Sequence, residues 1–152
     1  MAKVLPAQND KQNYYDLLRQ ADSVFRSKDY SNATKLFSKA FEANGWKSDQ
    51  ISLYNAACAW TQIKVPDSAF FNLMKIATML NYDNQIELEN DKDFFSLHSD
   101  ARWTKLCSIV HGNYIHKISK YLNPETQTLD SIYYFDQKSR YQLQDTSLTS
   151  IQ

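Results

Sequence analysis

Apolar residues of the first part of the chain recur every three or four positions, which is the spacing of an amphipathic helix and not the alternation of a strand. One such stretch covers residues 14–27, and Lys28-Asp29 interrupts it. A second stretch covers residues 30–41 and is followed by Asn44-Gly45. Both of these residues tolerate the left-handed conformation that ends helices. The pattern therefore predicts a first helical hairpin.

The same arrangement follows once more along the chain. Ser48 is the expected N-cap of a third helix, whose apolar residues run from Ile51 to Trp60. Pro66 suits the first turn of a fourth helix, where its missing N–H is not needed, and that helix extends to Leu80. Because the connections are very short, we expect a second antiparallel hairpin.

The two hairpins share a pattern of small and large residues. Three positions of the second helix match three of the fourth at an offset of 36 residues, namely Ala33, Phe37 and Ala40 against Ala69, Leu73 and Ile76. Another alanine, Ala21 or Ala57, stands twelve residues before the first position of each set. Small residues at such places let two helices approach closely, so the pattern indicates an internal repeat.

Residues 13–81 resemble the tetratricopeptide repeat family. DYSNATKLFSKAFEANG is similar to the second half of the family consensus and SLYNAACAW to its first half. The chain departs from the family pattern at five positions, which are Leu17, Gln20, Lys28, Lys64 and Ile76; the two lysines replace the glycine between helices. The resemblance implies an all-α fold of two tetratricopeptide-like hairpins and a role in protein interaction.

The residues after Asn81 resemble the segment that closes some bacterial arrays of this family. The match covers NYDNQIELENDKDFFSLHSDARWTKL, in which the apolar flank of the last hairpin would be covered by Phe94, Phe95, Leu97 and Trp103. A long helix is then predicted from about Asp100 to Tyr121. The expected fold is all-α, with two hairpins, a capping segment and one or two further helices.

The two ends of the chain are expected to lie outside this domain of residues 13–121. Residues 1–12 resemble a disordered leader or the remnant of a signal peptide, which favours an exported or periplasmic protein; a cytoplasmic protein is the alternative. Residues 122–152 are expected to begin a second, truncated helical unit at Asn123-Pro124. Its Asp136, Gln137 and Arg140 resemble the start of a poorly characterised bacterial domain, and Asp136 and Arg140 are spaced for a surface ion pair.

Composition narrows the functional classes. Two glycines and three prolines in 152 residues do not suit a β-sandwich or a phosphate-binding glycine loop. A formal net charge of zero does not suit a nucleic-acid binder, and no apolar run approaches the ~20 residues of a membrane span. Cys58 and Cys107 are expected to be small core residues and not a disulfide. We expect no cofactor and no enzymatic activity.

Two candidate metal sites have weak support. Cys107 and His111 are one helical turn apart, but His116 points elsewhere and a fourth ligand is missing. The acidic run over residues 87–93 lacks the central glycine and the final glutamate of a calcium loop. We therefore expect no metal.

The inner groove of the hairpins is the remaining candidate site. In the family that the chain resembles, the first helix of each hairpin lines this groove. The exposed groove positions would be Tyr15, Leu18, Arg19, Asp22, Arg26, Ile51, Tyr54, Asn55, Cys58 and Gln62. We expect a scaffold or adaptor that binds a peptide or a partner protein there. Two alternatives remain open: a regulatory or spacer domain of a larger exported protein, and self-association through the last helix.

Overall fold

The structure is a computed structural model that describes residues 6–120, 132–133 and 136–139. Within these residues every regular element is helical, which confirms the all-α fold. The elements are α1 (Pro6–Arg26), α2 (Tyr30–Ala43), α3 (Gln50–Gln62), α4 (Pro66–Met79), α5 (Gln85–Asn90), the 3-10 helix η1 (Lys92–Leu97) and α6 (Ala101–Ser119).

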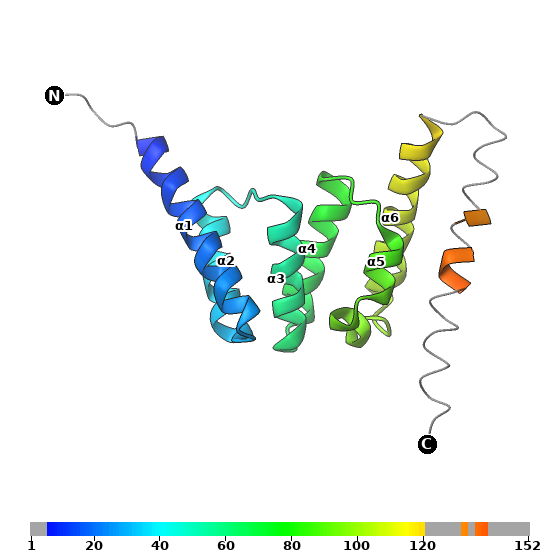
Figure 1. The fold of residues 1–152 in the computed structure, drawn as a ribbon, viewed down its shortest axis with the longest axis horizontal. Coiled ribbons are helices and arrows are strands. Elements are labelled where there is room, and N and C mark those ends of the chain that lie inside the picture. Colours follow the sequence, from blue (N-terminus) through cyan, green and yellow to red (C-terminus); the bar gives the residue numbers. More distant parts are fainter. Residues whose placement is uncertain (1–5, 121–131, 134–135, 140–152) are drawn as a thin grey trace, which may run out of the picture.

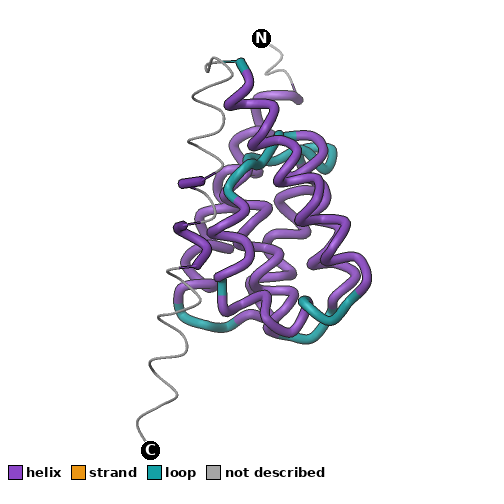
Figure 2. The backbone as a smooth tube through the Cα atoms, turned by 90° about the vertical axis from the view of Figure 1, so that its right-hand side faces the viewer, coloured by secondary structure: helices purple, strands orange, loops and turns teal. Residues whose placement is uncertain are grey.

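The helices form antiparallel pairs that follow one another across the molecule (Figure 1). Helix α1 packs on α2 and α3 packs on α4, as expected from the sequence, and α6 packs on both α4 and α5. Helices α1, α3 and α5 lie on one side, which we call the inner face, and α2, α4 and α6 form the outer face. Figure 2 looks along this stack and shows the two layers.

The repeated alanines lie where the helices meet. Ala21, Ala33, Ala57 and Ala69 have no exposed surface, and the large residues that follow them in the repeat, Phe37, Leu73 and Ile76, are equally buried. A methyl group at these crossings lets two backbones approach while the larger side chains fill the space on either side. The expected burial of these alanines is therefore confirmed.

The turns inside the two hairpins have the same geometry. Lys28 and Lys64 have positive φ angles of 64° and 60°. The next residue in each turn donates its N–H to a carbonyl five residues back, from Asp29 to Val24 at 3.2 Å and from Val65 to Trp60 at 3.0 Å. This is the hydrogen bond that ends a helix through a left-handed residue, a place usually taken by glycine.

Because a side chain disfavours this conformation, we expect Lys28→Gly and Lys64→Gly to raise the free energy of unfolding by about 0.5–1 kcal/mol each. Urea denaturation followed by circular dichroism measures this change. Lys39→Gly, at an exposed position inside α2, is the control, and it should lower stability by about 1 kcal/mol. If all three glycine variants were less stable than the unchanged chain, the lysines at the two turns would not be strained.

The helix boundaries correct two details of the prediction. Pro66 begins α4 as expected, but the N-cap of α3 is Asp49, whose carboxylate accepts the N–H of Ser52 at 2.9 Å. Ser48 does not cap this helix, because its hydroxyl is hydrogen-bonded to the Tyr14 hydroxyl at 2.8 Å. An aspartate one residue further on therefore replaces the predicted serine.

The segment after α4 has the form of a third hairpin. Helices α2, α4 and α6 begin at Tyr30, Pro66 and Ala101, so that their starts are about 36 residues apart. The elements α5 and η1 together take the place of a first helix, interrupted at Asp91, whose ψ of 115° is extended. Phe94, Leu97 and Trp103 are buried as predicted.

Phe95 was also predicted to cover the apolar flank of the second hairpin. This prediction is wrong, since Phe95 is 47% exposed. The side chains of Phe94 and Phe95 leave the backbone of η1 in different directions, because neighbouring residues of a helix do not share a face. Only the first of the two therefore reaches the core.

The two ends of the chain are described only in part. Residues 1–12 were expected to be a disordered leader or the remnant of a signal peptide; helix α1 begins at Pro6, so residues 6–12 are helical and not disordered, and residues 1–5 lie outside the described part. Proline at a first helical position fits this early start. In the segment predicted to begin a second unit, Lys138 forms an ion pair with Glu89 of α5 at 3.0 Å. The predicted pair of Asp136 with Arg140 lies outside the described residues.

Candidate functional site

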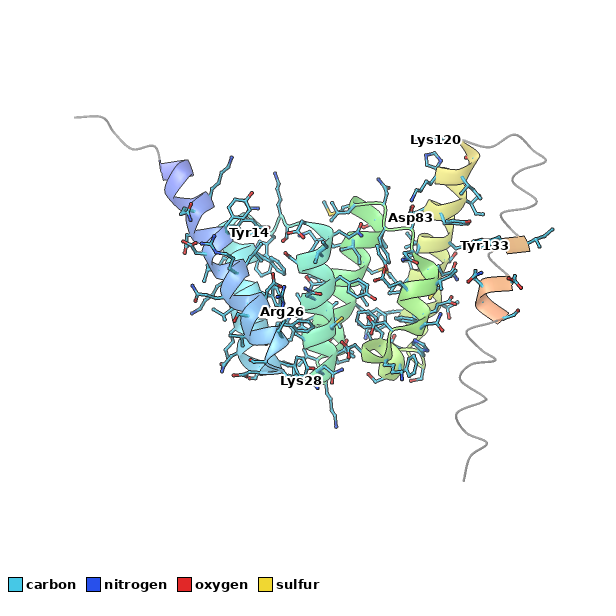
Figure 3. The ribbon with its side chains drawn as sticks, viewed as in Figure 1. Tyr14, Arg26, Lys28, Asp83, Lys120 and Tyr133 are labelled. Carbon is cyan, nitrogen blue, oxygen red and sulfur yellow. The ribbon has the colours of Figure 1, made fainter. Side chains whose placement is uncertain are left out.

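Two exposed apolar side chains mark one end of the inner face. Tyr15 of α1 is 57% exposed and Ile51 of α3 is 70% exposed. The hydrogen bond between Tyr14 and Ser48 ties this end of α1 to the residue just before α3, and Figure 3 shows Tyr14 at that end. The two apolar side chains are therefore presented at the same end of the inner face of α1 and α3.

Polar side chains occupy the next predicted groove positions along the inner face. Arg19 is exposed and forms an ion pair with Asp16 one turn earlier. Asn55 of α3 donates to the carboxylate of Asp22 on α1 at 3.4 Å, which connects the two helices. Arg26 is exposed at the last turn of α1 (Figure 3). This part of the groove offers both signs of charge and side-chain hydrogen-bonding groups.

Two predicted groove residues are not on the surface. Leu18 is 7% exposed and Cys58 is 3% exposed, and both belong to the hydrophobic core. Burial raises the pKa of the Cys58 thiol, and the nearby carboxylates of Asp91 and Asp93 raise it further. The thiol therefore stays protonated, and the prediction that Leu18 and Cys58 are exposed groove positions is wrong.

The third hairpin packs against the two other predicted groove residues of α3, Tyr54 and Gln62. Tyr54 donates its hydroxyl to Asp91 at 2.8 Å and packs its ring edge-to-face on Phe94, with the centroids 5.2 Å apart. Burial and the Asp91 hydrogen bond both raise the pKa of Tyr54. Gln62 donates to Asp93 at 2.9 Å. Tyr54 and Gln62 thus hold η1 in place, and of the predicted groove residues of α3 only Ile51 and Asn55 stay outside these contacts with η1 and outside the core.

The acidic run of residues 87–93 has a structural use. Glu87 accepts the hydroxyl of Tyr82 at 3.0 Å, Asp91 accepts the N–H of Asp93 at 3.0 Å, and both aspartates bind α3 as described above. Within the described ranges no three His, Cys, Asp or Glu residues are grouped so that they could hold a metal ion. Cys107, one of the weak metal candidates, is half-buried, and burial together with Glu89 raises its pKa to about 12.

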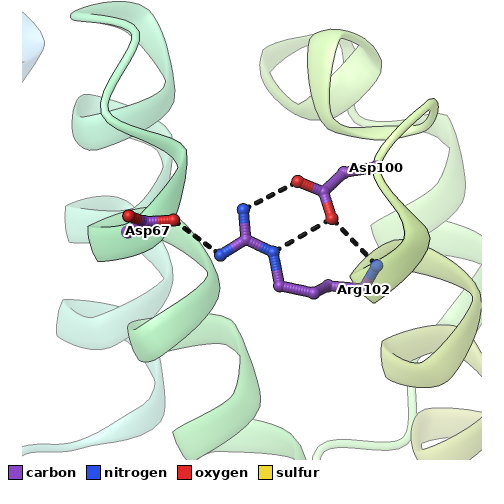
Figure 4. A network of polar contacts seen from close by, with 3 residues as sticks. All are labelled: Asp67, Asp100 and Arg102. Carbon is purple, nitrogen blue, oxygen red and sulfur yellow. Dashed lines mark hydrogen bonds and ion pairs between the residues drawn. The ribbon is translucent and has the colours of Figure 1, made fainter.

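One arginine joins the second and third hairpins (Figure 4). The Arg102 guanidinium donates to Asp67 of α4 at 2.7 Å and to both oxygens of Asp100, and it stacks over Phe70 at 4.3 Å from the ring centroid. These hydrogen bonds lower the pKa of Asp100 to about 2. Because the folded pKa is lowered, the stabilisation is present at neutral pH and is lost as the pH falls through the acid range.

The outer face carries an apolar surface that was not predicted from the sequence. Trp46, Phe71 and Met79 are 49%, 56% and 67% exposed, and the rings of Trp46 and Phe71 meet edge-to-face at 6.4 Å. The adjacent pair Phe70-Phe71 was an available signal, because two neighbouring residues of one helix cannot both face the core. Phe70 is the buried member, at 2% exposure.

Comparisons with family models, with curated proteins and with solved structures found no match to this chain. Among the helices that the structure describes, none has the length and apolar character to cross a membrane.

Proposed function

We propose that this chain is a non-catalytic interaction module of the tetratricopeptide type, which binds a peptide segment of a partner protein along the inner face of α1 and α3. The observation that carries the proposal is the pair of hairpins with a common turn geometry and fully buried alanines at equivalent positions, 36 residues apart. Stacked hairpins of this kind expose a continuous inner surface made by one helix of each pair.

The groove residues suggest how the segment would be held. Tyr15 and Ile51 offer apolar contacts at one end, and aromatic side chains are frequent anchors of binding surfaces. Arg19, Asp22 and Asn55 offer hydrogen bonds in the middle. Asp22 would repel a terminal carboxylate, so we expect the ligand to be the interior of a segment and not its carboxyl end.

Selection of a displayed random peptide library on the immobilised chain tests this proposal. We expect the selected peptides to bind the double variant Tyr15→Ala, Ile51→Ala about tenfold or more weakly than the unchanged chain, because two exposed apolar contacts are lost. The matched control is Phe71→Ala, Met79→Ala, which removes exposed apolar area from the outer face. Peptides that bind the inner-face variant as well as the unchanged chain would contradict the proposal.

A further inference from the structure

A cavity of about 520 Å³ opens on the outer face, between α2 and α4. Aromatic side chains from three helices and a loop line it, namely Phe41, Trp46, Trp60 and Phe71. Its volume lies within the range of about 300–1,000 Å³ that is usual for ligand pockets. A lining of this kind suits an apolar group, or a cation that can lie against aromatic rings.

The charge beside this cavity favours the cation. Among the described residues that line the cavity, Asp67 is the one that carries a charge. The Asp67 side chain is 87% exposed and forms an ion pair with Arg102, which is also paired with Asp100. Because two carboxylates share one guanidinium group, one negative charge remains at the cavity.

The lysines of this surface line a neighbouring cavity of about 550 Å³ and not this one. Of these, the Lys75 ammonium group donates to the carbonyl of Trp46 and lies over the ring of Phe71, 5.6 Å from the centroid. One face of Phe71 is therefore already occupied by a cation. The indoles of Trp46 and Trp60 remain for a ligand, and tryptophan is the side chain that binds cations best through its ring.

The exposed wall of the cavity is held in position. Trp46 has a φ of 62°, its N–H donates to the carbonyl of Phe41 at 2.6 Å, and its own carbonyl is held by Lys75. Its ring stands at 90° to that of Phe71, with the centroids 6.4 Å apart, so the two rings form walls at a right angle. A wall that is fixed before binding lowers the entropy that a ligand must overcome.

We propose that this cavity is a second binding site, separate from the inner face, which takes an organic cation with a quaternary ammonium head group. The methyl groups of the cation pack against Trp46 and Trp60, and the Asp67 carboxylate balances its charge. A primary ammonium group binds less well, because it is strongly hydrated and its three N–H donors need acceptors that aromatic rings do not supply.

Titration with choline at constant ionic strength tests this proposal, followed by nuclear magnetic resonance of the indole N–H groups of the isotope-labelled chain. The chain has three tryptophans, of which Trp46 and Trp60 line the cavity and Trp103 lies in α6. We expect the first two signals to shift with a dissociation constant of about 1 mM and the third to stay unchanged. Tryptophan-to-phenylalanine variants assign the three signals.

Two matched probes identify the head group. The neutral choline analogue, in which a carbon atom replaces the nitrogen, has the same shape and no charge. Ethanolamine has the charge and no methyl groups. We expect both to bind about tenfold or more weakly than choline.

Variants locate the site on the outer face. Trp46→Leu removes a ring but keeps an apolar side chain, and Asp67→Asn removes the charge; each should weaken choline about fivefold or more, as read from the Trp60 signal. Both residues are exposed enough for the fold to tolerate the change. Tyr15→Leu and Asp22→Asn make the same kinds of change on the inner face and should leave the affinity unchanged.

Four results would each overturn the proposal. They are equal affinities for choline and its neutral analogue, equal shifts of all three indole signals, an unchanged affinity in either cavity variant, and no shift up to about 50 mM choline.

Discussion

Replacing Phe94 by alanine is expected to lower the free energy of unfolding by about 3–5 kcal/mol, the cost of removing a large aromatic side chain from a packed core. Phe94 has no exposed surface, and its ring lies 5.2 Å from that of Tyr54 and 6.3 Å from that of Trp103. It therefore joins α3, η1 and α6. Chemical denaturation followed by far-ultraviolet circular dichroism would measure the change.

The neighbouring residue supplies a matched control for this prediction. Phe95 is 47% exposed, so Phe95→Ala should cost less than about 1 kcal/mol. If Phe94→Ala were as mild as Phe95→Ala, or if it produced a separate early transition that left the first two hairpins intact, the third hairpin would not share their core.

Replacing Ala69 by leucine is expected to cost about 1–3 kcal/mol, although the substitution adds apolar volume to a core. Ala69 of α4 has no exposed surface. A larger side chain at this position must push the neighbouring helices apart or leave its preferred rotamer. Ala33→Leu should have a similar effect in the first hairpin, because Ala33 is equally buried at the equivalent position of α2. Thermal and urea denaturation would measure both.

Ala101→Leu is the control for these two variants, since Ala101 is exposed at the first turn of α6 and should accept leucine with little change. If leucine at Ala33 or Ala69 left the free energy of unfolding unchanged, the helices would not be in close contact at that position. That outcome would also remove the main support for the tetratricopeptide-like arrangement.

The helices of the first two hairpins could be predicted closely from the sequence because the signals are local. The period of the apolar residues sets each helix and the face that it buries, and Asn44-Gly45 and Pro66 mark helix ends by their backbone preferences. The start of α1 was not predicted, because Pro6 and the polar residues after it carry no apolar period, and only the structure places them in the helix.

The third hairpin was predicted as a capping segment followed by a long helix, and not as a hairpin. Its first helix is divided into α5 and η1 at Asp91, so the apolar residues on either side do not keep one helical period. What holds this segment is a set of contacts from another part of the chain, including the hydrogen bonds of Tyr54 with Asp91 and of Gln62 with Asp93. Such contacts between residues far apart in the chain leave no pattern within one helix.

The candidate groove was predicted only in part for the same reason. Tyr15, Arg19 and Ile51 are exposed as expected, whereas Leu18 and Cys58 are buried. A helical pattern says which residues share a face, but the width of the buried stripe depends on what packs against it. The aromatic cavity beside Trp46 is a further example, since it combines residues from α2, α3, α4 and a loop.

The sequence by itself determined the helical class, the repeat of about 36 residues and the alanines at the helix crossings, because each of these follows from periodicity and side-chain size along a single stretch of chain. The tertiary structure alone decided which of the predicted groove residues stay exposed, that η1 covers α3, and that the buried Asn72 oxygen finds no hydrogen-bond partner among the described residues. Burial and hydrogen-bond partners are properties of the neighbours that a residue meets, and those neighbours come from distant parts of the chain.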